Sequence, residues 1–163
     1  TGSMQVSQDV DTINQLYKQL SQRADRLYQF VLLYSEYING QHDYGEGHIF
    51  TMLEIHVLTY IQDHPGVTPT QLAKAWCKTK GAISQTITKL AAQGYVYREK
   101  KEGNKKAVHL YTTQEGDAVS NMHKAYDVAD IVQTLQDLQR SCSQEDIDAF
   151  YKVLDAYTKL LQH

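Results

Sequence analysis

Apolar residues recur every three or four positions along most of this chain, a spacing typical of helices that bury one face. The first stripe predicts a helix over residues 9–39, which a glycine-rich loop follows. A second stripe predicts a helix over residues 48–63. Near the other end, two further stripes predict a long helix from Thr113 and a final helix from Ser143.

Capping residues predict two shorter helices in the middle of the chain. Thr68 can cap the first, with Pro69 at its first position and Gln71 completing a capping box. Thr79 can cap the second, which ends where Gly94 permits a left-handed backbone. Only a tight turn is left between the two helices.

The helix after Thr79 is predicted to have one apolar face and one face without carboxylates. Alternating residues then predict strands over 95–98 and 107–111, joined by a charged hairpin over residues 99–106. The pattern predicts a mainly helical protein of six helices, with a β-hairpin wing after the fourth. This is the order of a winged helix-turn-helix.

Composition agrees with a single folded unit. The chain has 163 residues, of which 42% are hydrophobic and 21% charged, so it is too apolar for a disordered chain. No apolar run approaches the roughly 20 residues that cross a bilayer, so we expect no membrane span. No signal peptide is visible, and Cys77 and Cys142 form no Cys-x-x-Cys pair. We expect a cytoplasmic protein.

Charge is distributed unevenly. The net charge is −3, but residues 64–114 carry nine lysines and arginines against two glutamates, a net +7, which leaves −10 for the rest. A basic segment in an acidic protein indicates a site for a polyanion such as DNA. The alternative is a solvated lysine-rich surface.

A helix that enters a major groove, about 12 Å wide, needs small or hydrogen-bonding side chains on its outer face. Ser84, Gln85 and Thr88 meet this need, and we expect them to read bases. Cations beside them and in the hairpin suit phosphates. The residues predicted to contact DNA are Thr70, Gln71, Lys78, Lys80, Gly81, Ala82, Ser84, Gln85, Thr88, Lys89, Arg98, Asn104, Lys105 and Lys106.

Residues 68–73, 80–90, 93–98 and 104–116 resemble the MarR (multiple-antibiotic-resistance regulator) family. The resemblance implies a sequence-specific transcriptional regulator, expected to be a repressor, that binds a pseudo-palindromic duplex as a homodimer. It also implies three parts: a dimerisation helix and loop over residues 1–47, a DNA-binding lobe over 48–116, and C-terminal dimerisation helices over 117–163.

The wing departs from the family pattern, which usually carries Asp-x-Arg. Here Asn104, Lys105 and Lys106 occupy the aligned positions. Lysine lacks the planar fork of arginine, so we expect this wing to contact phosphates rather than to read the minor groove.

Relatives of this kind often release DNA when a small aromatic or phenolic compound binds beneath the lobe. The candidate ligand residues are Tyr34, Tyr37, His48, Met52 and His56, the last three placed at one-turn spacing on the helix predicted over residues 48–63. Histidine and tyrosine groups there would suit a carboxylate or a phenol. The alternative is that these tyrosines are core or interface residues.

Other functions rest on fewer residues. A zinc-responsive regulator would use His42, Asp43, Glu46 and His48, with His123 to complete the site, although the spacing does not match a known metal motif. We expect no metal and no cofactor. Cys77 is either a redox switch or a small buried filler.

Two further classes remain for comparison. A non-specific architectural DNA binder would share the basic segment. An enzyme is not expected, because the chain has no glycine-rich phosphate loop and no Gly-x-Ser-x-Gly elbow.

Overall fold

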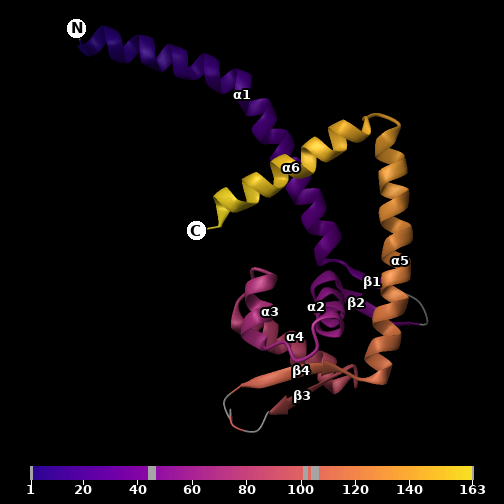
Figure 1. The fold of residues 1–163 in the computed structure, drawn as a ribbon. Helices are drawn as coiled ribbons and strands as arrows, with labels where there is room; N and C mark the ends of the chain where they lie inside the picture. Colours follow the sequence, from indigo (N-terminus) through magenta and orange to yellow (C-terminus); the bar gives the residue numbers. More distant parts are fainter. Residues whose placement is uncertain (1, 44–46, 101–102, 104–106, 163) are drawn as a thin grey trace.

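The computed structural model describes residues 2–43, 47–100, 103 and 107–162. Within these residues it contains six helices and two antiparallel strand pairs (Figure 1). The elements, in chain order, are α1 (Gly2–Asn39), β1 (Gln41–Asp43), β2 (Ile49–Thr51), α2 (Met52–Asp63), α3 (Pro69–Ala75), α4 (Lys80–Ala92), β3 (Val96–Lys100), β4 (Val108–Thr112), α5 (Gln114–Gln139) and α6 (Gln144–Leu161). The mainly helical fold with a hairpin after the fourth helix is therefore confirmed.

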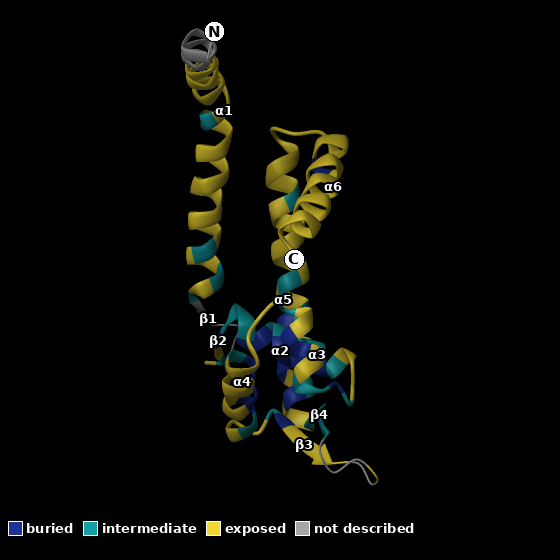
Figure 2. Cartoon of the chain, turned by 90° about the vertical axis from the view of Figure 1, so that its left-hand side faces the viewer, coloured by how far each residue is buried: buried dark blue, intermediate teal, exposed yellow. Residues whose placement is uncertain are grey.

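The core lies in the lobe that α2, α3, α4 and the wing form. Figure 2 shows the buried positions concentrated there, whereas α1, α6 and most of α5 are exposed. Each lobe helix contributes its apolar face, and α2 packs against α4, α5 and β4. Fully buried side chains of this core are Phe50, Ile55, Val57, Leu58, Ile61, Leu72, Ile83, Ile87, Leu90 and Leu110.

Local capping explains where the helices begin. Thr68 Oγ1 accepts from the Gln71 amide while Gln71 Oε1 accepts from the Thr68 amide, so the predicted capping box is present. Thr79 Oγ1 accepts from the amide of Ala82 at 3.2 Å and caps α4. Gly94 follows α4 with φ +82°, the left-handed backbone expected there.

The wing is a two-stranded sheet extended by the loop before α3. Strand β3 pairs with β4 from Val96 opposite Thr112 to Lys100 opposite Val108. The Gly66 amide donates to the Leu110 carbonyl at 2.8 Å, and the Leu110 amide donates to the Val67 carbonyl at 2.9 Å. This bridge ties the helix-turn-helix to the wing.

The starts of two helices and one pair of strands differ from the sequence-based expectation. Helix α1 begins at Gly2 rather than at residue 9. Helix α2 begins at Met52 rather than at residue 48, because Ile49–Thr51 pairs with Gln41–Asp43 and Thr51 caps the helix. The strands β1 and β2 were not predicted.

Beyond the lobe, α1 and α5 extend away from it, and α6 turns back after α5 (Figures 1 and 2). Ile147 is the buried residue of α6 among those described. No helix in the described part of the chain has both the length and the apolar character that a bilayer crossing requires.

Candidate nucleic-acid interface and ligand cleft

Helix α4 presents the predicted polar face to solvent. Ile83, Ile87 and Leu90 are buried against the lobe, which turns the opposite side of the helix outward. On that side Ala82 is half-buried, and the exposed residues are Lys80, Gly81, Ser84, Gln85, Thr88 and Lys89. The arrangement leaves a carboxylate-free surface open to a groove.

Helix α3 and the turn before α4 add a second set of predicted contacts. Thr70, Gln71 and Lys78 are exposed. The side-chain oxygen of Gln71 is already engaged in the capping box, so its amide nitrogen is the group left for a phosphate. Cys77, in the turn, has φ +51° and is exposed rather than a buried filler.

Besides Gln71, three predicted DNA residues are engaged within the protein. Lys89 Nζ lies 2.9 Å from Glu54 Oε1, and Glu54 is only 7% exposed. Arg98 Nη2 donates to Thr88 Oγ1 at 3.0 Å. Lys89 therefore anchors α4 to α2, and Arg98 anchors the wing strand to α4, in addition to any contact with DNA.

Residues 101–102 and 104–106, in the tip of the wing, fall outside the described residues. Asn104, Lys105 and Lys106 are among them, and their predicted role stays a prediction. The described end of β3, at Lys100, is exposed and follows Arg98 toward this tip.

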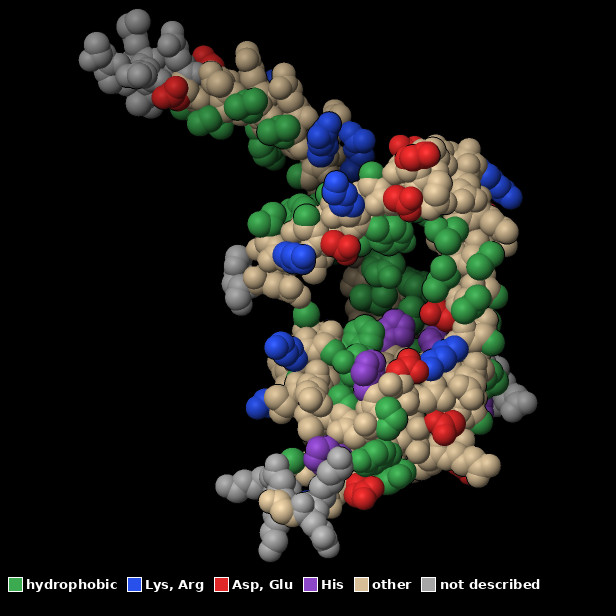
Figure 3. Space-filling model, in the orientation of Figure 1, with side chains coloured by type: hydrophobic (Ala, Val, Ile, Leu, Met, Phe, Trp, Pro, Cys, Tyr) green, Lys and Arg blue, Asp and Glu red, His purple; other side chains and the backbone are tan. Residues whose placement is uncertain are grey.

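Four of the five predicted ligand residues line one cleft of about 620 Å³. Tyr34 and Tyr37 come from α1, and Met52 and His56 come from α2. The cleft lies where α1 and α5 leave the lobe, and Figure 3 shows hydrophobic and histidine side chains around the hollow on this side. The residues that complete the lining are Asp127, Asp130, Ile131, Thr134, Leu135 and Tyr151.

Sequence reasoning missed these additional lining residues. Asp127, Asp130, Ile131 and Thr134 follow helical spacing and share one face of α5. Two acids on such a face were a usable signal, but only the position of α1 against α5 shows that they meet the tyrosines.

Burial sets the protonation of the cleft. Burial and the neighbouring Asp130 carboxylate raise the pKa of Tyr37, whose hydroxyl donates to Asp130 Oδ2 at 3.4 Å. Burial lowers the pKa of His56, whose ring stacks on Trp76 with centroids 5.0 Å apart. At neutral pH the phenol keeps its proton and the imidazole is uncharged.

The prediction that places His48 with Met52 and His56 is wrong. Because α2 starts only at Met52, His48 precedes β2 and does not share the helix face. Its Nδ1 lies 3.0 Å from the Tyr95 hydroxyl, and its ring packs on Phe50.

The zinc candidates do not assemble in the part that is described. Glu46 and the side chains of His42 and Asp43 lie outside it. His123 is buried near His56, with ring centroids 6.0 Å apart. Among the described side chains no group of three His, Cys, Asp or Glu residues is placed to hold a metal ion.

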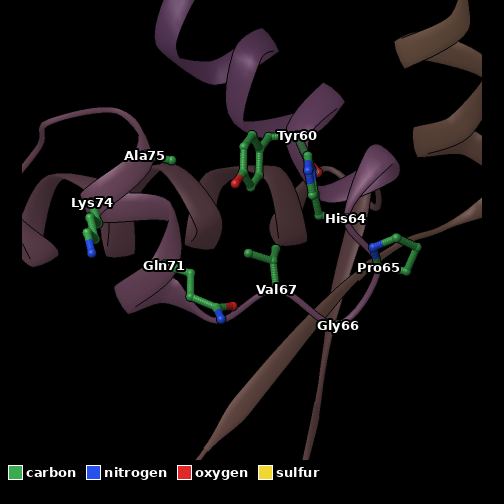
Figure 4. Close-up of a pocket in the computed structure, with 8 residues that line it drawn as sticks. All are labelled: Tyr60, His64, Pro65, Gly66, Val67, Gln71, Lys74 and Ala75. Atoms are coloured by element: carbon green, nitrogen blue, oxygen red, sulfur yellow. Dashed lines mark hydrogen bonds between the residues drawn. The ribbon is translucent and has the colours of Figure 1, made fainter.

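A second, more open cavity of about 790 Å³ lies on the lobe between the end of α2 and α3 (Figure 4). Tyr60 of α2 and His64, the residue after α2, lie in this cavity with their ring centroids 4.0 Å apart. Gln71 and Lys74 of α3 lie on the opposite side. It adjoins the surface of α3 that carries predicted phosphate contacts.

Comparison with known proteins agrees with this architecture. Residues 50–108 match the model of the MarR family. They form a MarR-family domain. The chain is 33% identical over 84 residues to the uncharacterized HTH-type transcriptional regulator YhjH of Bacillus subtilis, an alignment that covers 52% of this chain and 48% of YhjH. This chain thus spans about half the length of that relative.

Solved structures share the fold of the MarR-family domain and its flanking helices. FabT of Streptococcus pneumoniae, in complex with DNA, superposes with a TM-score of 0.63 at 23% identity, covering 90% of this chain and 97% of FabT. The zinc-responsive MarR family member ZitR of Lactococcus lactis gives a TM-score of 0.66 at 15% identity, covering 88% of this chain and 99% of ZitR. The family model that residues 50–108 match is that of the MarR family, and YhjH is named as a transcriptional regulator.

Proposed function

We propose that this protein is a cytoplasmic transcriptional regulator that binds specific duplex DNA. The observation that carries the proposal is the outer face of α4, which is exposed, free of carboxylates and rich in hydrogen-bonding side chains. Ser84 and Gln85 would read base edges in the major groove. The FabT complex with DNA supports the same role for the fold.

Phosphate contacts would come from the residues around this face. Lys78 and Lys80 are exposed beside it and free of any ion pair with a described residue. Thr70, Gln71, Gly81 and Ala82 add neutral groups. We assign Lys105 and Lys106, with Asn104, to the backbone beside the neighbouring minor groove.

The protein would act as a homodimer on a pseudo-palindromic site. Helices α1, α5 and α6 expose many large apolar side chains, among them Leu20, Leu27 and Leu161. We assign residues 1–47 and 117–163 to dimerisation and residues 48–116 to the DNA-binding lobe. Two lobes held at a fixed spacing would read two half-sites.

A small aromatic ligand in the cleft would release the DNA and relieve repression. Residues of α1 and α5, which we assign to the dimer interface, and residues of α2, which belongs to the lobe, line this cleft together. A ligand that binds one arrangement of these helices more tightly than another shifts the population toward that arrangement. The spacing between the two lobes would then change as well.

Selection of genomic fragments bound by the full chain tests this function. We expect a recurring inverted repeat, bound at least about a thousandfold more tightly than a scrambled duplex at moderate salt. Comparable affinity for selected and scrambled duplexes would instead indicate a non-specific DNA binder. The matched variants are Lys80→Ala, which should weaken every duplex, and Lys18→Ala on α1, which should weaken none.

A further inference from the structure

The cleft between α1, α2, α5 and α6 is acidic. Asp127 and Asp130 lie among the ten described residues that line it, and these ten include no lysine or arginine. The sequence alone predicts a phenolic or carboxylate ligand for this region. Two carboxylates in the lining would repel a ligand carboxylate, and a neutral phenol would gain nothing from their charge.

Neighbouring titratable groups do not cancel this charge. His56 is uncharged at neutral pH because burial lowers its pKa, and Tyr37 keeps its proton. Lys124, which precedes Asp127 by three residues on α5, points to the lobe, where its Nζ lies 2.6 Å from Asp63 Oδ1 and 2.7 Å from Gln62 Oε1. The cleft thus carries a net negative charge.

The rest of the lining is aromatic and apolar. The Tyr34 ring lies between Phe30 and Tyr37, with centroid distances of 5.6 and 6.0 Å. Tyr151 contributes a further ring from α6. Aromatic faces carry negative potential and attract cations, and Ile131 and Leu135 offer apolar contact to the body of a ligand.

We propose that this cleft binds a small organic cation with an aromatic or apolar body. Its charged centre would lie near Asp127 and Asp130, and its body against the tyrosines. The cleft of about 620 Å³ is large enough for a molecule of several rings. The consequence for DNA binding rests on the proposed regulatory function, whereas the binding itself does not.

Two ions of the same size and opposite charge test the binding. Tetraphenylphosphonium and tetraphenylborate are titrated separately into the full chain at pH 7.5, with heat as the readout. We expect one phosphonium ion per chain, bound at least about tenfold more tightly than the borate. Equal affinities, tighter binding of the borate, or no phosphonium binding would overturn the proposal, the last being the result if side chains of a second copy fill the cleft.

Charge-removing variants locate the site. Asp127→Asn and Asp130→Asn should each weaken phosphonium binding by about tenfold. Asp137→Asn removes the same charge from the same helix outside the lining and should leave the affinity unchanged. Unchanged affinity in both cleft variants, with melting curves like that of the unaltered chain, would overturn the assignment.

Affinity for a duplex from the selection is then measured with and without the phosphonium ion. A change that is lost in Asp130→Asn supports regulation through this cleft. Binding of the ion without any change in DNA affinity would overturn the regulatory consequence alone. Failure of the chain to bind any duplex would overturn the proposed function, and calorimetry would still decide the cation site.

Discussion

Gln85 lies on the exposed face of α4, where its side-chain amide can meet a base edge. An amide that pairs with a base distinguishes it from other bases by about 1–3 kcal/mol. We therefore expect Gln85→Ala to lose discrimination between the selected duplex and single-base variants, with little change on scrambled DNA. Quantitative gel shifts across such a duplex series measure this. Lys80→Ala is the control, since loss of a phosphate contact should weaken all duplexes alike; a uniform loss with Gln85→Ala would contradict base reading.

Lys89 holds the buried carboxylate of Glu54 rather than projecting freely toward a phosphate. Glu54 Oε2 has no hydrogen-bond partner among the described residues, so Lys89 is the principal compensation for this charge. The Lys89 side chain is 47% exposed, which reduces the effect by solvent screening. We expect Lys89→Ala to lower the free energy of unfolding by about 1–2 kcal/mol, measured by urea denaturation.

Lys80→Ala on the same helix should change stability by less than about 0.5 kcal/mol. The double variant Glu54→Gln/Lys89→Ala should be more stable than the sum of the two single changes predicts. Strict additivity of the two changes would show that the pair contributes nothing to stability.

His56 and His123 lie where the lobe meets α5, and burial lowers the pKa of both. Near pH 6.5 the two histidines bind protons in the unfolded chain but not in the folded chain. The free energy of unfolding therefore falls as the pH falls through this value. It levels off below the pKa values of the folded state. Urea denaturation between pH 7.5 and 5.5 should show this loss, and His56→Gln/His123→Gln should show less of it. An equal loss in the two proteins would contradict the assignment.

At the scale of elements, the start of α5 is in direct contact with Tyr95, the residue before β3. The Thr113 amide donates to the Tyr95 carbonyl at 3.0 Å, and a Cβ at Gly116 would overlap that same oxygen. We expect Gly116→Ala to lower the free energy of unfolding by about 2–4 kcal/mol, because either β3 or α5 must move. Thermal or urea unfolding measures it.

Gly81 offers the matched control for this change. It lies in the first turn of α4, and beyond its chain neighbours and the helix backbone no described atom lies within 4 Å of the position that a Cβ would take. Gly81→Ala should therefore be neutral or stabilise the protein by up to about 0.5 kcal/mol. Similar losses in both variants would mean that the effect belongs to glycine replacement in general and not to the contact with Tyr95.

Elements were predictable where their signals are local. Thr68, Thr79, Thr113 and Ser143 each cap the helix that the sequence assigns to them, because a capping bond reaches only three residues along the chain. The β1–β2 pair was missed because its strands have three residues each and Gln41–Asp43 shows no alternation of apolar and polar residues. Because residues 49–51 belong to this pair, α2 also begins later than the sequence predicts.

The candidate sites were likewise predictable only where they depend on local sequence. The outer face of α4 follows from helical period alone, so its exposed residues could be predicted. The link of Lys89 to Glu54 joins positions 35 residues apart, and the meeting of Tyr37 with Asp130 joins positions 93 apart. Such contacts depend on how helices pack, which periodicity does not specify.

At the scale of the whole molecule, the single chain leaves much apolar surface uncovered. Val10, Ile13, Leu20 and Leu27 of α1 are each about half exposed or more. Helices α5 and α6 carry further exposed apolar side chains, such as Phe150 and Leu161. Exposed apolar surface of this extent on helices that leave the lobe supports the proposed homodimer.

A dimer joined through the long helices would also explain the uneven charge distribution. The segment with net charge +7, residues 64–114, lies almost wholly in the lobe, while the remaining residues, with −10, include the three long helices. A dimer joined through the long helices would hold two basic lobes apart and keep the acidic part away from DNA.

The mass of the protein in solution tests whether α1 forms the dimer interface. Sedimentation should give twice the chain mass of 18.6 kDa at micromolar concentration. Leu27→Glu should shift the protein toward monomer by raising the dissociation constant at least about tenfold, because a charge would have to be buried at the interface. In a monomer the same residue is 48% exposed, and the change would cost little stability.

Gln29→Glu adds an equal charge two positions along the helix, away from the stripe that holds Leu27, and should leave the mass unchanged. Equal masses for both variants at every concentration would place the interface elsewhere than on this stripe of α1.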